Sequence, residues 1–159
     1  MKNLYLAIIL LAMSISSYAS NWNYEYLEND FGEDTKLASI KDDNDLYELV
    51  VTLDRTVALL LPTGKVTSPE CSKVCKAKIN VDGNKNLEPI KLLESRDFRT
   101  YFIYGESKDR FIGYLESGKD VKIQLPLHRN LAVLSFTPDS KLNLDKLNNL
   151  QSPSPSPKL

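Results

Sequence analysis

The sequence predicts a mainly β protein, a small β-sandwich or barrel-like antiparallel sheet with one short amphipathic helix. Apolar and polar residues alternate along most segments after residue 20, which is the pattern of strands that bury one face. Turn-forming residues separate these segments, and only the segment after Gly105 carries apolar residues at helical spacing. Strand pairing is therefore expected to build most of the fold.

The first predicted strand covers residues 22–26, where Trp22, Tyr24 and Tyr26 occupy every second position. This spacing places the three rings on one face of a strand, and we expect that face to pack on a core. The segment 28–34 is acidic and has no period, so it is expected to be a loop. It lacks the ligand order of a calcium-binding EF-hand, which favours a solvated acidic loop over a calcium site.

A hairpin is predicted over residues 47–61. Its first strand has one strongly apolar face, formed by Tyr47, Leu49, Val51 and Leu53. The segment 54–56 turns the chain, and the continuous apolar run 57–61 is short enough to be a buried strand. The two strands are expected to pair with each other.

Further strands are predicted at 77–81, which leads into a turn at 82–84, and at the aromatic-rich segment 99–104. Ser107 is expected to cap the helix, which presents three apolar residues on one face, and Gly118 to end it. The apolar residues of that face are Phe111, Ile112 and Leu115.

A second hairpin is predicted to pair 121–125 with 131–136 through a connection at 126–130. Leucines then recur at 142, 144 and 147, where a last strand or a turn is expected.

Residues 1–19 are predicted to be a secretory signal peptide. Lys2 gives a short positive region, an apolar stretch follows at 4–13, and Ser17-Tyr18-Ala19 forms a small-residue cleavage site. Cleavage after Ala19 would place the mature protein in the periplasm or the medium. No later run of about 18 apolar residues follows, so no membrane anchor is expected.

The rest of the chain is predicted to hold one β-rich domain, residues 20–150, and a short tail, residues 151–159. The domain is long enough for a core of its own and too short for two ordinary domains. The tail alternates Ser and Pro, which supply little apolar area, and it is expected to be disordered.

Cys71 and Cys75 are the only cysteines of the chain. An exported protein meets an oxidising environment, so a disulfide is the preferred interpretation. A redox pair is the alternative, although reactive dithiols usually have the shorter Cys-x-x-Cys spacing. His128 is the only histidine, which leaves too few ligands for a zinc site. No metal and no cofactor are expected.

Four short motifs stand out along the chain: Cys71-x3-Cys75-x-Ala77-x-Ile79-x-Val81-Asp82-Gly83, Phe111-Ile112, Lys119-Asp120-Val121-x-Ile123 and Leu134-x-Phe136. With Trp22-x-Tyr24 and the stretch 36–39, they span most of the mature chain. Together they resemble a loose group of small exported bacterial proteins of unassigned function. A weaker similarity in layout is to invasion-associated locus B proteins. Both resemblances imply an exported β-rich fold and carry over no site residues.

Composition and motifs disfavour several function classes. The chain has 20 basic and 21 acidic residues, whereas nucleic-acid or anionic-lipid binding usually needs a basic excess. Phosphate loops, the Gly-x-Ser-x-Gly elbow and the His-Glu-x-x-His motif do not occur. The carboxylate pairs Glu94 with Asp97 and Glu106 with Asp109 are more simply solvated charge clusters than catalytic groups. No catalytic residue is assigned.

The favoured function is a non-enzymatic binding module for another envelope or exported macromolecule. A periplasmic inhibitor or immunity protein and a small hydrolase remain as alternatives, and the oligomeric state stays open. Loops are expected to carry the partner-binding residues, because they expose polar and aromatic groups without disturbing strands. These residues are Asp30, Phe31 and Asp34 in the acidic loop and His128 and Arg129 in the connection of the second hairpin.

Overall fold

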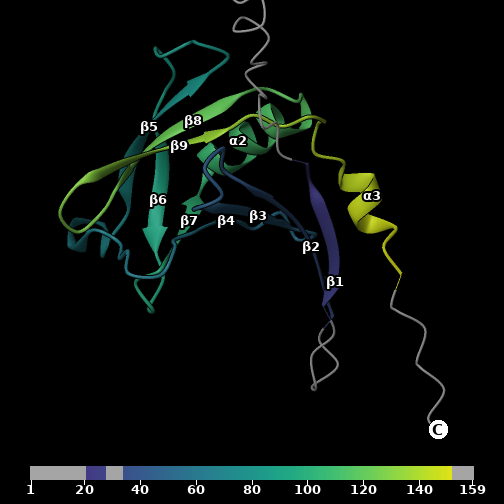
Figure 1. Ribbon diagram of the computed structural model, residues 1–159, viewed down its shortest axis with the longest axis horizontal. Helices are drawn as coiled ribbons and strands as arrows, with labels where there is room; N and C mark the ends of the chain where they lie inside the picture. Colours follow the sequence, from purple (N-terminus) through teal and green to yellow (C-terminus); the bar gives the residue numbers. More distant parts are fainter. Residues whose placement is uncertain (1–20, 28–33, 152–159) are drawn as a thin grey trace, which may run out of the picture.

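The computed structural model describes residues 21–27 and 34–151. Within this part of the chain, nine antiparallel strands form a curled half-barrel sheet in the order β1-β2-β3-β4-β7-β6-β5-β8-β9 (Figure 1). The prediction of a mainly β, barrel-like fold is confirmed, whereas the predicted signal peptide and almost all of the predicted tail lie outside the described residues. The strands are β1 (Asn23–Leu27), β2 (Thr35–Lys41), β3 (Glu48–Thr52), β4 (Val57–Leu60), β5 (Cys75–Val81), β6 (Ile90–Glu94), β7 (Thr100–Tyr104), β8 (Val121–Pro126) and β9 (Leu131–Phe136).

Both predicted hairpins form, and the core lies on the inner face of the curled sheet. In β3 and β4, Leu49 pairs with Leu59 and Val51 with Val57, and all four side chains are buried. Leu53 was expected on the same apolar face but is 42% exposed, because β3 ends at Thr52 and the chain turns there. The second hairpin pairs β8 with β9 over the whole of both strands.

The predicted helix is α2 (Glu106–Glu116), which packs against β6 and β7 through its buried apolar residues, Phe111, Ile112 and Leu115. Gly118 has a φ of 66° just past the helix end, as the C-terminal glycine position requires. Ser107 does not cap the helix, because the capping position is Gly105. The Ser107 hydroxyl instead donates to the carbonyl of Tyr104 at 2.7 Å and accepts from the Lys91 amide at 3.0 Å.

Two strands, β2 and β6, were not predicted from the sequence. In β2, the consecutive residues Ala38, Ser39 and Ile40 are all buried, so the alternation that marks a half-buried strand is lost. In β6, only Ile90 and Leu92 alternate as buried residues before the strand ends. A pattern of two residues is too short to identify a strand.

The leucines at 142–147 form neither of the predicted elements. Leu144 begins a second short helix, α3 (Leu144–Asn148), which packs beside β1 and β2 (Figure 1). The side-chain oxygen of Asn143 caps this helix by accepting a hydrogen bond from the Lys146 backbone amide at 2.9 Å. The backbone amide of Asn143 donates to the Tyr24 hydroxyl at 2.9 Å. Leu144 and Leu147 are three residues apart, so they share one face of the helix.

A buried tyrosine ties together segments that are far apart in the sequence. The Tyr101 hydroxyl donates to the carbonyl of Pro126 in β8 and accepts from the amide of Ser68, both at 2.7 Å. Burial raises the pKa of Tyr101 above its usual value, and the nearby Glu94 carboxylate adds to this effect. The neutral hydroxyl therefore persists as the donor that the Pro126 carbonyl needs.

The predicted disulfide forms between Cys71 and Cys75, whose Cα atoms are 4.9 Å apart. Cys71 is buried at the end of a short 3-10 turn, η1 (Pro69–Cys71), and Cys75 begins β5. The bridge thus fixes the loop that enters β5.

Replacing both cysteines by serine is expected to lower the free energy of unfolding by about 2 kcal/mol. Without the bridge, the short loop between the two residues is no longer closed in the unfolded chain, which gains conformational entropy. Urea unfolding of the double variant and the parent protein measures this loss, and far-UV circular dichroism should show the same strand content. Equal unfolding midpoints for the two proteins would show that the bridge does not stabilise the domain.

Candidate binding groove

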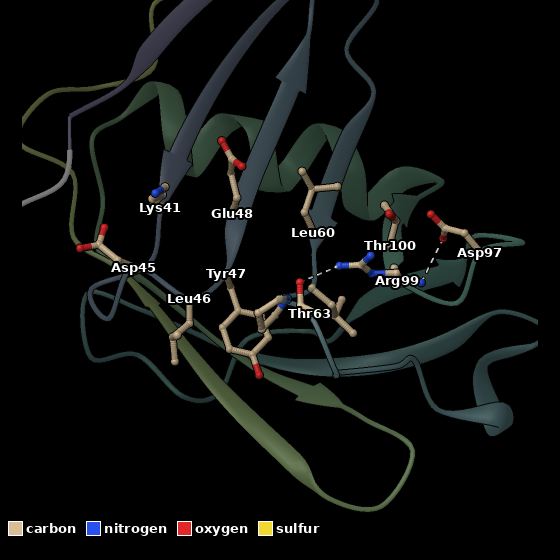
Figure 2. Close-up of a pocket in the computed structure, with 12 residues that line it drawn as sticks. Lys41, Asp45, Leu46, Tyr47, Glu48, Leu60, Thr63, Asp97, Arg99 and Thr100 are labelled. Atoms are coloured by element: carbon tan, nitrogen blue, oxygen red, sulfur yellow. Dashed lines mark hydrogen bonds between the residues drawn. The ribbon is translucent and has the colours of Figure 1, made fainter.

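A groove of about 460 Å³ lies on the outer face of the sheet, at one end of β2, β3, β4 and β7. Lys41, Glu48, Leu60 and Thr100 are successive cross-strand neighbours in the register of these four strands. Their side chains stand in a row across the sheet (Figure 2). Because neighbouring residues on a strand face opposite sides, this row is turned away from the buried row of Leu49, Leu59 and Tyr101.

One wall of the groove is the turn between β2 and β3. The buried Asp42 holds this turn, because its carboxylate accepts from the Leu46 amide at 2.7 Å and from the Tyr47 amide at 2.8 Å. Tyr47 is buried beneath the groove, whereas Leu46 is 58% exposed. Burial, with the neighbouring Asp42 charge, raises the pKa of Tyr47, so its hydroxyl stays neutral.

The opposite wall is the turn between β6 and β7. Asp97 accepts hydrogen bonds from the Ser95 hydroxyl and from the Arg99 amide, the latter at 3.0 Å. The bond from Ser95 is the main cause that lowers the pKa of Asp97, and the Arg99 amide adds to it. The Arg99 guanidinium extends over the groove, where it lies 3.5 Å from the hydroxyl of Thr63 (Figure 2).

The groove combines charges of both signs with the exposed side chain of Leu46 and the half-buried side chain of Leu60. Within the described part of the chain, neither Lys41 nor Arg99 has a carboxylate within 4 Å. Both cations are therefore available to an anionic group of a bound molecule. The acidic residues of the lining are Asp45, Glu48 and Asp97.

Among the described residues that were predicted to bind a partner, Asp34 does not lie beside His128 and Arg129. Asp34 is exposed just before β2, where it accepts a hydrogen bond from the Tyr26 hydroxyl. His128 and Arg129 are exposed at the tip of the β8–β9 hairpin, at the opposite end of the strand order (Figure 1). Asp30 and Phe31 lie outside the described residues. Whether any of these residues binds a partner stays a prediction.

Sequence reasoning missed the groove because four separate segments assemble it. One signal was present in the apolar run 57–61. In an antiparallel strand with one buried face, such a run must place alternate apolar residues, here Ala58 and Leu60, on the outer face of the sheet. An outer face with apolar residues is a departure from the usual polar pattern and marks a candidate contact surface.

The carboxylate pairs considered for a hydrolase make other contacts. Glu94 accepts from the Thr67 hydroxyl at 2.7 Å and lies opposite Tyr101, on the inner side of the sheet. Asp97 holds the turn on the groove wall. On α2, Asp109 lies 3.4 Å from the Arg55 guanidinium. Glu106, the fourth of these carboxylates, is the first residue of α2. That none of the four is catalytic stays a prediction.

The described residues contain no group of three or more His, Cys, Asp or Glu side chains placed to hold a metal ion. A helix long and apolar enough to cross a membrane is likewise not found among them. No family model, curated protein or solved structure matches the chain. The resemblance to small exported proteins therefore stays a prediction.

Proposed function

We propose that this protein is an exported, non-enzymatic binding module that captures another exported or envelope macromolecule through the groove. The observation that carries this proposal is that Lys41 and Arg99, which have no carboxylate within 4 Å among the described residues, line the groove together with Leu46 and Leu60. We further propose that residues 1–19 direct the chain to the periplasm or the medium, where the partner would be met.

The chemistry of the groove supports a partner segment with both apolar and acidic side chains. The exposed Leu46 and the half-buried Leu60 lose unfavourable contact with water when a partner covers them. A salt bridge between exposed groups contributes only about 0.2–1 kcal/mol, so Lys41 and Arg99 would act mainly by selecting and orienting the partner. The row across four strands is open at the surface and suits an extended segment rather than an enclosed small molecule.

The test compares a groove variant with a matched control in the exporting cell. The double variant Lys41→Glu and Arg99→Glu reverses both positive charges, and neither side chain forms a salt bridge among the described residues. Lys76→Glu is the control, because Lys76 is an exposed residue of β5 outside the groove. Chemical cross-linking in cells, followed by purification and mass spectrometry, identifies and quantifies the captured partner.

We expect one exported or envelope protein to be enriched with the parent chain and with Lys76→Glu, and about tenfold less with the double variant. The melting temperatures of the parent and Lys76→Glu should agree, because the substitution is on the surface. That of the double variant should be only slightly lower, because Lys41→Glu places a second carboxylate opposite Glu48. Equal capture by the double variant would contradict the groove as the binding site. A partner that is a toxic enzyme inhibited by the protein would specify the inhibitor function.

A further inference from the structure

The strand β9 forms one edge of the sheet and carries exposed apolar residues. Leu131 and Val133 are each 60% exposed, although both belong to a regular strand. The other edge strand, β1, has α3 packed beside it. Edge strands of soluble proteins are usually covered, charged or interrupted, so an apolar edge is unusual.

The hydrogen bonds of β9 show which of its backbone groups point away from β8. Ser135 accepts from the Asp43 amide at 2.8 Å, and the Thr137 amide donates to the Asp43 carboxylate at 3.1 Å. In an antiparallel strand, the amide and carbonyl of alternate residues point to the same side. Leu131 and Val133 therefore direct their backbone groups to the edge, as Ser135 and Thr137 do.

The strand pairing agrees with this assignment. Leu131 lies opposite Pro126, which has no amide hydrogen to donate, so this pair cannot exchange two hydrogen bonds. No described residue forms a hydrogen bond with the edge-facing amides and carbonyls of Leu131 and Val133. The unpaired part of the edge thus consists of the amides and carbonyls of Leu131 and Val133. It ends at Ser135, whose carbonyl accepts the hydrogen bond from the Asp43 amide.

We propose that a second copy of this chain occupies the edge, with the two β9 strands antiparallel about a two-fold axis at Ala132. In this register Leu131 of one copy lies opposite Val133 of the other, and each pair exchanges two N–H···O bonds. The pairing uses all the free groups of both edges and leaves the bond from Asp43 to Ser135 intact. The two sheets would then become one continuous sheet.

Side chains support a second copy as the occupant. Leu131 and Val133 of opposite copies become cross-strand neighbours on the outer face, where apolar pairs stabilise a sheet. A surface that complements itself in this way suits a closed two-fold dimer.

The first test uses Val133→Pro in the mature protein. Proline removes the amide hydrogen that points to the edge and none that bonds to β8, and edge strands tolerate it. Sedimentation velocity over a concentration series should show a parent dimer and a variant whose dimer dissociation constant is raised about tenfold or more. Val133→Ile, which keeps both the amide and an apolar β-branched side chain, should dimerise like the parent. A parent protein that is monomeric up to about 1 mM would overturn the proposal.

The second test decides the register even if the proline variant does not fold. Ala132 of the two copies form a non-hydrogen-bonded pair with Cα atoms about 4.5 Å apart, which suits a disulfide. Ala132→Cys should therefore form covalent dimers in air. Ser135→Cys is the control, because the two Ser135 positions would lie about 20 Å apart along the strands. Cross-linking that is absent in Ala132→Cys, or equally strong in both variants, would overturn this pairing.

Discussion

Replacing Leu49 by alanine is expected to lower the free energy of unfolding by about 3 kcal/mol, because the change opens a cavity in the core. Leu49 is fully buried on the inner face of β3, where it pairs with Ile40 of β2 and Leu59 of β4. Three strands meet at this side chain, and a paired backbone cannot move inward to fill the space. Urea unfolding at 25 °C measures the loss as a lower midpoint with an unchanged slope.

Leu53→Ala is the matched control for this prediction. The same side chain is removed only a few residues along the chain, but Leu53 is 42% exposed beyond the end of β3. Its loss should cost less than about 1 kcal/mol, because surface substitutions rarely have larger effects. Equal losses at the two positions would show that Leu49 does not lie in a close-packed core.

Replacing Asp42 by alanine is the second change with a large expected effect, about 3 kcal/mol. The Asp42 carboxylate accepts from the amides of Leu46 and Tyr47, and the residue is only 1% exposed. Removing the carboxylate leaves donors without their acceptor where water has little access, and hydrogen bonds to charged groups contribute more than neutral ones. The unfolding free energy and the hydrogen-exchange rates of these two amides measure the effect.

Asp42→Asn is the control, because the amide side chain has the same shape and keeps one oxygen acceptor. It should lose clearly less stability than Asp42→Ala, and the amides of Leu46 and Tyr47 should stay protected from exchange. Unchanged protection in Asp42→Ala would contradict the role of this carboxylate. If the role is confirmed, the alanine variant should also weaken partner capture, since Leu46 lies on the wall of the groove.

The local parts of this fold could be predicted from the amino-acid sequence. The β3–β4 and β8–β9 hairpins join neighbouring segments, so a periodic pattern and a turn are enough to identify them. The helix α2 was predicted from its apolar spacing and from Gly118 at its end. The Cys71–Cys75 bridge followed from a cysteine pair with no other partner in the chain. Each feature depends on residues that are close in the sequence.

The order of the strands and the position of the groove could be established only from the folded structure. The pairing of β4 with β7 and of β5 with β8 joins segments about 40 residues apart, and period-2 alternation does not specify a partner. The groove depends on this order, because Lys41, Leu60 and Arg99 meet only after β4 has paired with β7. The sequence analysis considered Asp97 only as the partner of Glu94 in a carboxylate pair, whereas the structure places Asp97 on the wall of the groove. The distance between two residues along the chain does not determine which residues become neighbours across a sheet.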